Sequence, residues 1–200
     1  MKRKRYFILM VVLVAVGTLA VWRFAFARSP APELDQSIDL NRVRVELSFD
    51  YARQSGMASN QIAAWVTDKD GAVVKTLFAT NFTAGHGGWE YRKESLPQWV
   101  AESGVAGMGK PQLDAISRAT PASGSVRYAW YLDDSEARPV PAGLYAVNVE
   151  ATLRRENRVL FQAAILVGGE DREERPPPVF FGSGTDERGM LTNVVIQYRK

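Results

Sequence analysis

The only histidine of the chain, His86, lies in a glycine-rich segment beside two aromatic residues. In Ala84-Gly-His-Gly-Gly88, with Trp89 and Tyr91 following, an imidazole could line a small-molecule pocket or act as a general acid or base. No carboxylate or nucleophile is spaced to orient it in a recognised catalytic pattern. We therefore interpret the segment as a surface loop that carries one imidazole, with the pocket as the alternative.

Two acidic clusters contain the residue types that bind cations. Asp68-Lys-Asp-Gly71 resembles the start of a calcium loop, but the later ligands and the closing glutamate are missing. The second cluster could bind a divalent cation weakly and consists of Asp133, Asp134 and Glu136. We interpret both as turns, because an Asp-Gly step favours a tight hairpin and aspartates commonly cap turns. With one histidine and no cysteine, the sequence predicts neither a zinc site nor a disulfide.

The net positive charge of the chain comes from its first 27 residues. Five of the 25 Lys and Arg residues lie in the first 27 positions, which contain no acid, and this leaves 20 basic against 22 acidic residues. A faintly acidic remainder offers no electrostatic footprint for nucleic acid, so we exclude that partner. The chain also lacks a Walker loop, a dinucleotide fingerprint and a Gly-x-Ser-x-Gly elbow. No catalytic constellation is found, and we do not expect an enzyme.

The first 27 residues have the pattern of a membrane-targeting segment. A cationic patch, Met1–Arg5, precedes Tyr6–Trp22, which carries no charge and predicts a helix inserted with its N-terminus in the cytoplasm. Either the helix stays as an uncleaved anchor in the inner membrane, or Ala25-Phe-Ala27 is a signal-peptide cleavage site. Both alternatives place the following residues in the periplasm. Residues 28–40 form a polar, proline-bearing linker, and residues 41–200 form one extracytoplasmic domain.

Alternating apolar residues predict a mostly β domain. We expect seven strands, in an antiparallel arrangement with one wet face, over residues 43–49, 61–67, 72–78, 126–131, 145–151, 159–167 and 194–198. Seven short strands with turn-rich connections favour an immunoglobulin-like β-sandwich. One short helix is expected over Glu94–Ser103, with Pro97 in its first turn.

Two long segments interrupt this pattern and are expected to be loops. They span Asn81–Ser123 and Gly169–Gly189, and loops of this length in a compact domain are usually functional. Phe180 and Phe181 lie in the second loop, and exposed loop aromatics are typical interface anchors. We therefore predict that they contact an envelope membrane protein.

Three blocks of the sequence resemble an uncharacterised bacterial family of predicted periplasmic domains of unknown function. They are Ala63–Leu77, Gly87–Val100 and Asp114–Pro121. The resemblance implies an accessory role beside membrane flavin systems, namely PepSY-type reductases and FMN transferases. The stretch Trp130–Tyr145 also resembles a hairpin of flagellar-hook-cap-like immunoglobulin domains, although Tyr131 and Leu132 replace the Asp and Gly of that pattern.

Asp114-Ala-Ile-Ser-Arg-Ala-Thr120 resembles the acceptor motif of extracytoplasmic FMN transferases. The resemblance implies that the Thr120 hydroxyl attacks a phosphoryl group of FAD and tethers FMN as a phosphoester, with Asp114 and Ser117 in the motif. Arg118 stands where the motif has glycine, so a side chain or a forbidden positive φ angle could block the reaction. In the alternative interpretation, Asp114 or Ser117 caps a turn. Three functions thus remain open: an accessory interaction module, an FMN-carrying electron-transfer protein, or an envelope scaffold or adhesion domain.

Overall fold

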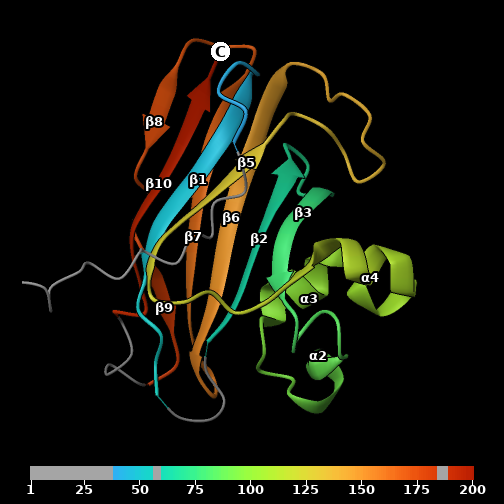
Figure 1. Cartoon of the computed structure of the whole chain (residues 1–200), viewed down its shortest axis with the longest axis vertical. Helices are drawn as coiled ribbons and strands as arrows, with labels where there is room; N and C mark the ends of the chain where they lie inside the picture. Colours follow the sequence, from blue (N-terminus) through green and yellow to red (C-terminus); the bar gives the residue numbers. More distant parts are fainter. Residues whose placement is uncertain (1–37, 56–59, 184–188) are drawn as a thin grey trace, which may run out of the picture. The chain divides into compact units, whose positions relative to one another are not determined.

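The computed structural model describes residues 38–55, 60–183 and 189–200 (Figure 1). The predicted membrane segment and most of the linker lie outside these ranges. Within them, no helix has the length and apolar character needed to span a membrane. The described chain is mostly β and forms two sheets, as the alternating pattern predicts.

The smaller sheet contains four antiparallel strands in the order β5-β1-β10-β8. Their bounds are Arg44–Tyr51 for β1, Gly124–Trp130 for β5, Arg172–Glu174 for β8 and Leu191–Arg199 for β10. Strand β1 lies in the middle of this sheet, where Val45 is opposite both Trp130 of β5 and Tyr198 of β10. The first and last long strands of the described chain are therefore direct neighbours.

The larger sheet contains six strands in the order β4-β3-β2-β6-β7-β9. Their bounds are Gln61–Asp68 for β2, Val73–Thr80 for β3, Ser117–Arg118 for β4, Gly143–Arg154 for β6, Asn157–Val167 for β7 and Val179–Phe181 for β9. All pairs are antiparallel except β3 with β4. The seven predicted strands are confirmed, and three short strands, β4, β8 and β9, were not predicted.

The main core lies between the two sheets. Alternate residues of both sheets point into it, including Phe49 of β1, Ile62 of β2 and Trp130 of β5. Phe78 of β3 stacks on Tyr128 of β5 with ring centroids 4.1 Å apart, which joins the two sheets at one side. Fully burying a large apolar side chain is worth about 1.5–3 kcal/mol, so this alternation fixes which face of each strand turns inward.

The outer face of β1 corrects one expectation. In the predicted strand over residues 43–49, Arg44 and Glu46 alternate with the apolar residues and so belong to the expected wet face, but both are less than 10 % exposed. Arg44 donates to Glu46 at 2.7 Å, and Arg127 of β5 approaches the same carboxylate at 3.0 Å. Burial opposes the charged form of Glu46, but the hydrogen bonds from Arg127 and Arg44 outweigh it, so the pKa of Glu46 lies below its ordinary value.

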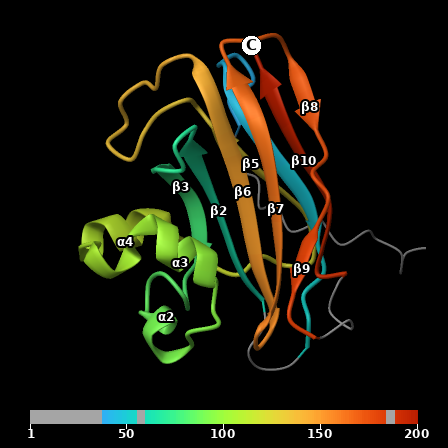
Figure 2. The ribbon, with the colours of Figure 1, turned by 180° about the vertical axis from the view of Figure 1, so that it is seen from behind.

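The first long segment predicted as a loop contains four short helices. It contains α2 (Gly88–Tyr91), α3 (Pro97–Ser103), the 3₁₀ helix η1 (Val105–Gly107) and α4 (Lys110–Ile116). The expected helix is confirmed from Pro97 onward, with proline in its first turn. Figures 1 and 2 show these helices beside β2 and β3. They cover a second core on the outer face of the six-stranded sheet, which includes Trp65, Leu96, Trp99 and Leu160.

Two polar side chains of β6 hold the start of α3 against this sheet. Buried Glu150 accepts hydrogen bonds from the backbone N–H of Trp99 at 2.9 Å and of Gln98 at 3.3 Å. Arg158 of β7 lies 2.9 Å from the same carboxylate. The hydroxyl of Thr152 accepts from the N–H of Leu96 at 3.0 Å. These contacts satisfy N–H groups that a helix start leaves without intrahelical partners.

Residues 169–183 of the second predicted loop form a strap, a segment that closes one side of the two sheets. Strand β8 pairs with β10 of the smaller sheet, and after Pro176–Pro178 the chain continues into β9, which pairs with β7 of the larger sheet. Phe180 and Phe181 are therefore in a strand, and only Phe181 is exposed. Phe180 packs against the main core, whereas the Phe181 ring lies 3.7 Å from the guanidinium of Arg158. Their predicted contact with a partner stays a prediction.

Candidate binding groove

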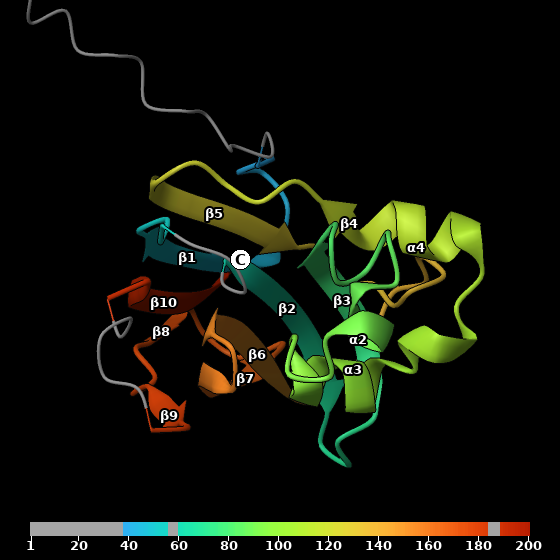
Figure 3. The same cartoon turned by 90° about the horizontal axis from the view of Figure 1, so that it is seen from below.

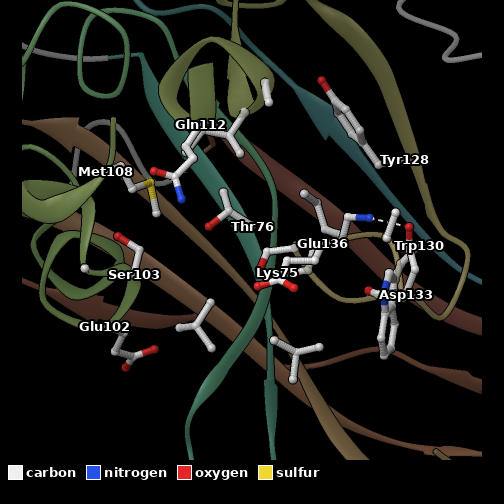
Figure 4. Close-up of a pocket in the computed structure, with 18 of the residues that line it drawn as sticks. Lys75, Thr76, Glu102, Ser103, Met108, Gln112, Tyr128, Trp130, Asp133 and Glu136 are labelled. Atoms are coloured by element: carbon white, nitrogen blue, oxygen red, sulfur yellow. Dashed lines mark hydrogen bonds and ion pairs between the residues drawn. The ribbon is translucent and has the colours of Figure 1, made fainter. Parts of the chain in front are cut away.

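The opposite side of the two sheets, at β3 and β5, carries a groove of about 1020 Å³ (Figure 4). Its floor is residues 73–77 of β3. One wall comes from α3, η1 and α4, and the other from β5 and the connection between β5 and β6. Figure 3 shows β5 and the helices on either side of β3. The groove is therefore formed by segments distant in sequence.

Hydrogen bonds from two tryptophans fix the helical wall. Trp99 of α3 donates through its indole Nε1 to the hydroxyl of Thr76 on β3 at 3.2 Å. Trp65 of β2 donates in the same way to Glu102 at the end of α3, at 2.7 Å. The rest of this wall exposes Met108 and Gln112 to the groove. Because both indoles are satisfied, this wall is a fixed surface.

The second wall is held by contacts between β3 and the connection after β5. The N–H of Ser135 donates to the carbonyl of Val74 at 3.1 Å, and Lys75 forms an ion pair with Asp133 at 2.6 Å. Trp130 donates through Nε1 to the carbonyl of Asp133 at 2.7 Å. Tyr128 lies further along β5 on the same wall.

The charged side chains Lys75 and Glu102 of the groove both have partners within the described chain. Lys75 is neutralised by Asp133, whereas Glu102 is bonded to the neutral donors of Trp65 and Gln98. Burial raises the pKa of Tyr128, with nearby Arg118 opposing the rise, so its phenol is neutral at pH 7. Among the described residues, no three His, Asp or Glu side chains are grouped to hold a metal ion.

The free edge of β3 runs along the floor of this groove. Strand β4 pairs with Ala79 and Thr80, and the Ser135 N–H reaches Val74. Between these contacts, Lys75, Thr76 and Phe78 have a strand partner only on the β2 side within the described chain, and Leu77 lies at a bulge. No linear motif marks this edge, because each of its neighbours comes from a different element.

The three residues of the predicted FMN motif lie beside the groove but have different surroundings. Asp114 is exposed on α4 and forms an ion pair with Lys110 at 2.9 Å. The Ser117 hydroxyl is buried and has no hydrogen-bond partner among the described residues. Thr120, between β4 and β5, is half-buried. Arg118 has no positive φ angle, so the glycine of the motif is not required here by backbone conformation. Modification of Thr120 stays a prediction.

The glycine-rich segment around His86 has a packing role. A Cβ added to Gly88 would lie 2.2 Å from the carbonyl oxygen of Phe82, and one added to Gly85 would lie 2.1 Å from the Asn81 side chain. His86 itself is exposed and does not line the groove. These two glycines permit a close approach of the backbone to its neighbours.

Both acidic clusters form turns, as predicted. The Asp68 carboxylate accepts from the N–H groups of Asp70 and Ala72, each at 2.9 Å. The Asp134 carboxylate accepts in the same way from Glu136 and Arg138, also at 2.9 Å. Their oxygens are therefore used to close the turns.

Comparison with known proteins identifies one family. The model of a family described as predicted periplasmic protein (DUF2271) matches residues 42–176. This match covers all three sequence blocks and confirms the resemblance drawn from them. No curated protein and no solved structure matches the chain.

Proposed function

Because the chain belongs to the DUF2271 family of predicted periplasmic proteins, we propose that residues 41–200 form a periplasmic binding module. Its role is to hold a partner in the groove along β3, and it has no catalytic step of its own. The main support is the asymmetry of the two sheets. The β7 and β10 side is covered by the strap, whereas the β3 and β5 side carries the groove.

The architecture and the sequence together support a finer form of this proposal. Two sheets that are antiparallel apart from the β3–β4 pair, packed over one core and built on seven long strands, support an immunoglobulin-like sandwich. Residues 1–27 tether the module to the inner membrane, or release it if cleaved after Ala27. The three sequence blocks support a partner within a membrane flavin-linked redox system. An envelope scaffold or adhesion role would use the same groove.

Site-specific photocrosslinking in cells tests this function. A benzoyl-phenylalanine at Gln112, which is exposed in the helical wall, should crosslink to one membrane protein. The same group at Glu156, in the exposed turn between β6 and β7, is the matched control and should not. A flavin-binding crosslinked protein supports the redox association. Equal crosslinking at both positions, or none at Gln112, contradicts a binding role for the groove.

FMN carriage on Thr120 is the second candidate. It is supported by the position of Thr120 two residues after β4, since Arg118 of β4 lines the groove with Tyr128 and Met108. Of the two motif hydroxyls, that of Ser117 is buried against Gly85, so Thr120 is the acceptor that a transferase would reach.

Intact mass of protein from native membranes tests this candidate. If the mass includes one FMN phosphoryl unit, this unit should be lost in Thr120→Ala. It should persist in the control Ser125→Ala, which removes a nearby exposed hydroxyl. Together these results assign the flavin to Thr120. An unmodified mass refutes FMN carriage and leaves the binding function as proposed. The same spectrum reports whether residues 1–27 are present.

A further inference from the structure

A chain of side chains on the outer face of the larger sheet joins the strap to the helical wall of the groove. We infer that the strap regulates the groove, because Phe181 of β9 acts through Arg158 as a positioning residue for α3. A partner that displaces Phe181 would thereby loosen the helical wall. This inference rests on the proposed binding function, since it concerns the regulation of that groove.

The chain of contacts begins at the strap. Strand β9 is the edge strand of the larger sheet, and its Phe181 is opposite Arg158 of β7 (Figure 2). Side chains directly opposite in an antiparallel pair lie on one face of the sheet. The Phe181 ring lies 3.7 Å from the Arg158 guanidinium, and a ring in this position attracts the cation. Phe181 therefore stabilises Arg158 in the position that it has above β7.

Arg158 contacts both the sheet and α3. Its Nη1 lies 2.9 Å from the carboxylate of Glu150 and 3.5 Å from the side-chain oxygen of Gln98 in α3. The same buried carboxylate accepts hydrogen bonds from the backbone N–H groups of Gln98 and Trp99. A buried carboxylate that loses its cation is costly. A displaced Arg158 would therefore weaken the contacts that attach the start of α3.

The start of α3 depends on such contacts because its backbone conformation is unfavourable. Leu96, directly before Pro97, has a φ angle of 52°. This left-handed conformation is costly for a residue with a side chain, and a following proline favours an extended conformation instead. Leu96 is held by its fully buried side chain and by Thr152, which is opposite Arg158 in the sheet. A helix held in this way can detach locally while the sheets stay folded.

Two tryptophan indoles connect α3 to the floor and the sheet beneath the groove. Trp99 of α3 donates to Thr76 at 3.2 Å, and Trp65 of β2 donates to Glu102 of α3 at 2.7 Å. Both bonds join the sheet to α3, so both break when α3 detaches. The indole of Trp130 donates to a carbonyl of the opposite wall instead. The three indole N–H groups therefore distinguish detachment of α3 from a general loss of stability.

Hydrogen exchange of these indoles, measured by NMR on the full-length protein in detergent, tests the inference. Phe181→Ala should speed exchange at Trp99 and Trp65 about two- to five-fold, on the scale of an exposed cation–π contact, and leave Trp130 unchanged. Phe181→Tyr keeps the ring and should restore the original rates. Val179→Ala removes an exposed apolar side chain two positions earlier in β9 and is the matched control.

A mutant cycle assigns the effect to Arg158 and Glu150. In a protein that carries both Glu150→Gln and Arg158→Met, the two buried charges are absent, and Phe181→Ala should have no further effect. Three results would overturn the inference: unchanged exchange at Trp99 in Phe181→Ala, equal acceleration at Trp130, or the full effect of Phe181→Ala in this background.

The exchange measurements need no partner, so they separate this inference from the binding function. If crosslinking at Gln112 succeeds while the exchange rates stay unchanged, the binding function stands and the strap does not regulate the groove. If the exchange rates change as expected while crosslinking fails, the strap positions α3, but the groove is not the binding site.

Discussion

Glu150 is the residue whose replacement most directly tests how the helical wall is held. Its carboxylate is fully buried and contacts the N–H groups of Gln98 and Trp99 and the guanidinium of Arg158. Glu150→Ala removes the acceptor for these donors and leaves Arg158 without its carboxylate partner. Breaking a buried ion pair on one side costs about 3–5 kcal/mol, and we expect a loss in this range. Glu150→Gln keeps one acceptor oxygen and should cost about 1–2 kcal/mol, from the charge-assisted part alone.

The pH dependence of stability provides a second test of the role of Glu150. Burial raises the pKa of Glu150, although the Trp99 and Gln98 N–H groups and Arg158 oppose the rise. The folded protein therefore binds this proton more tightly than the unfolded chain. The stability gained from this tighter proton binding is fully present below pH 4.5, the ordinary pKa. It is lost as the pH rises toward the pKa of Glu150 in the folded protein. Glu150→Gln should remove this part of the pH profile.

Urea unfolding followed by tryptophan fluorescence measures these losses, with Glu156→Gln as an exposed matched control. Hydrogen exchange at residues 97–103 shows whether α3 detaches before the sheets unfold. A cost below about 1 kcal/mol for Glu150→Ala, with unchanged protection of α3, would refute the argument that this carboxylate holds the helix.

Three further predictions follow from local contacts. Gly88→Ala should lower the free energy of unfolding by about 1–3 kcal/mol, because its methyl group meets the Phe82 carbonyl. Gly107→Ala adds a methyl group in open space and should leave the stability unchanged. Thermal unfolding compares the two variants. Phe181→Ala should cost about 1 kcal/mol through its lost guanidinium contact, and unchanged stability in urea would show that contact to be unimportant. Burial raises the pKa of Tyr51 to about 12, so stability should fall as the pH rises from 10.0 toward 12, and Tyr51→Phe should flatten this fall in alkaline unfolding curves.

The long strands were predictable because the alternation of apolar and polar residues indicates which face of a strand is buried. Residues 145–151 and 159–167 have apolar side chains at every second position, and both lie inside the observed β6 and β7. The burial of the outer face of β1 was not predictable, because the Glu46 carboxylate on this face is covered and bonded by Arg127, from a strand about 80 residues away. The short strands β4, β8 and β9 have only two or three residues each, and they exist only through pairing with a distant strand.

Of the helical wall, only α3 was expected, whereas η1, α4 and the groove were missed for the same reason. The first half of the segment from Asn81 to Ser123 contains glycines that permit close packing, and these favour a loop when judged locally. Glu150 and Thr152, which hold α3, are some 50 residues further along the chain. Of the groove, only the unusual length of this segment gave a signal in the sequence.

The neighbouring position of β1 and β10 has a consequence for the order of events during synthesis. Arg44 is paired with Arg199, so β1 gains this neighbour in the smaller sheet only after β10, residues 191–199, has been synthesised. Folds dominated by such distant pairings form slowly, in milliseconds to seconds. The pairing of β1 with β10 therefore delays completion of the smaller sheet until residues 191–199 have been synthesised.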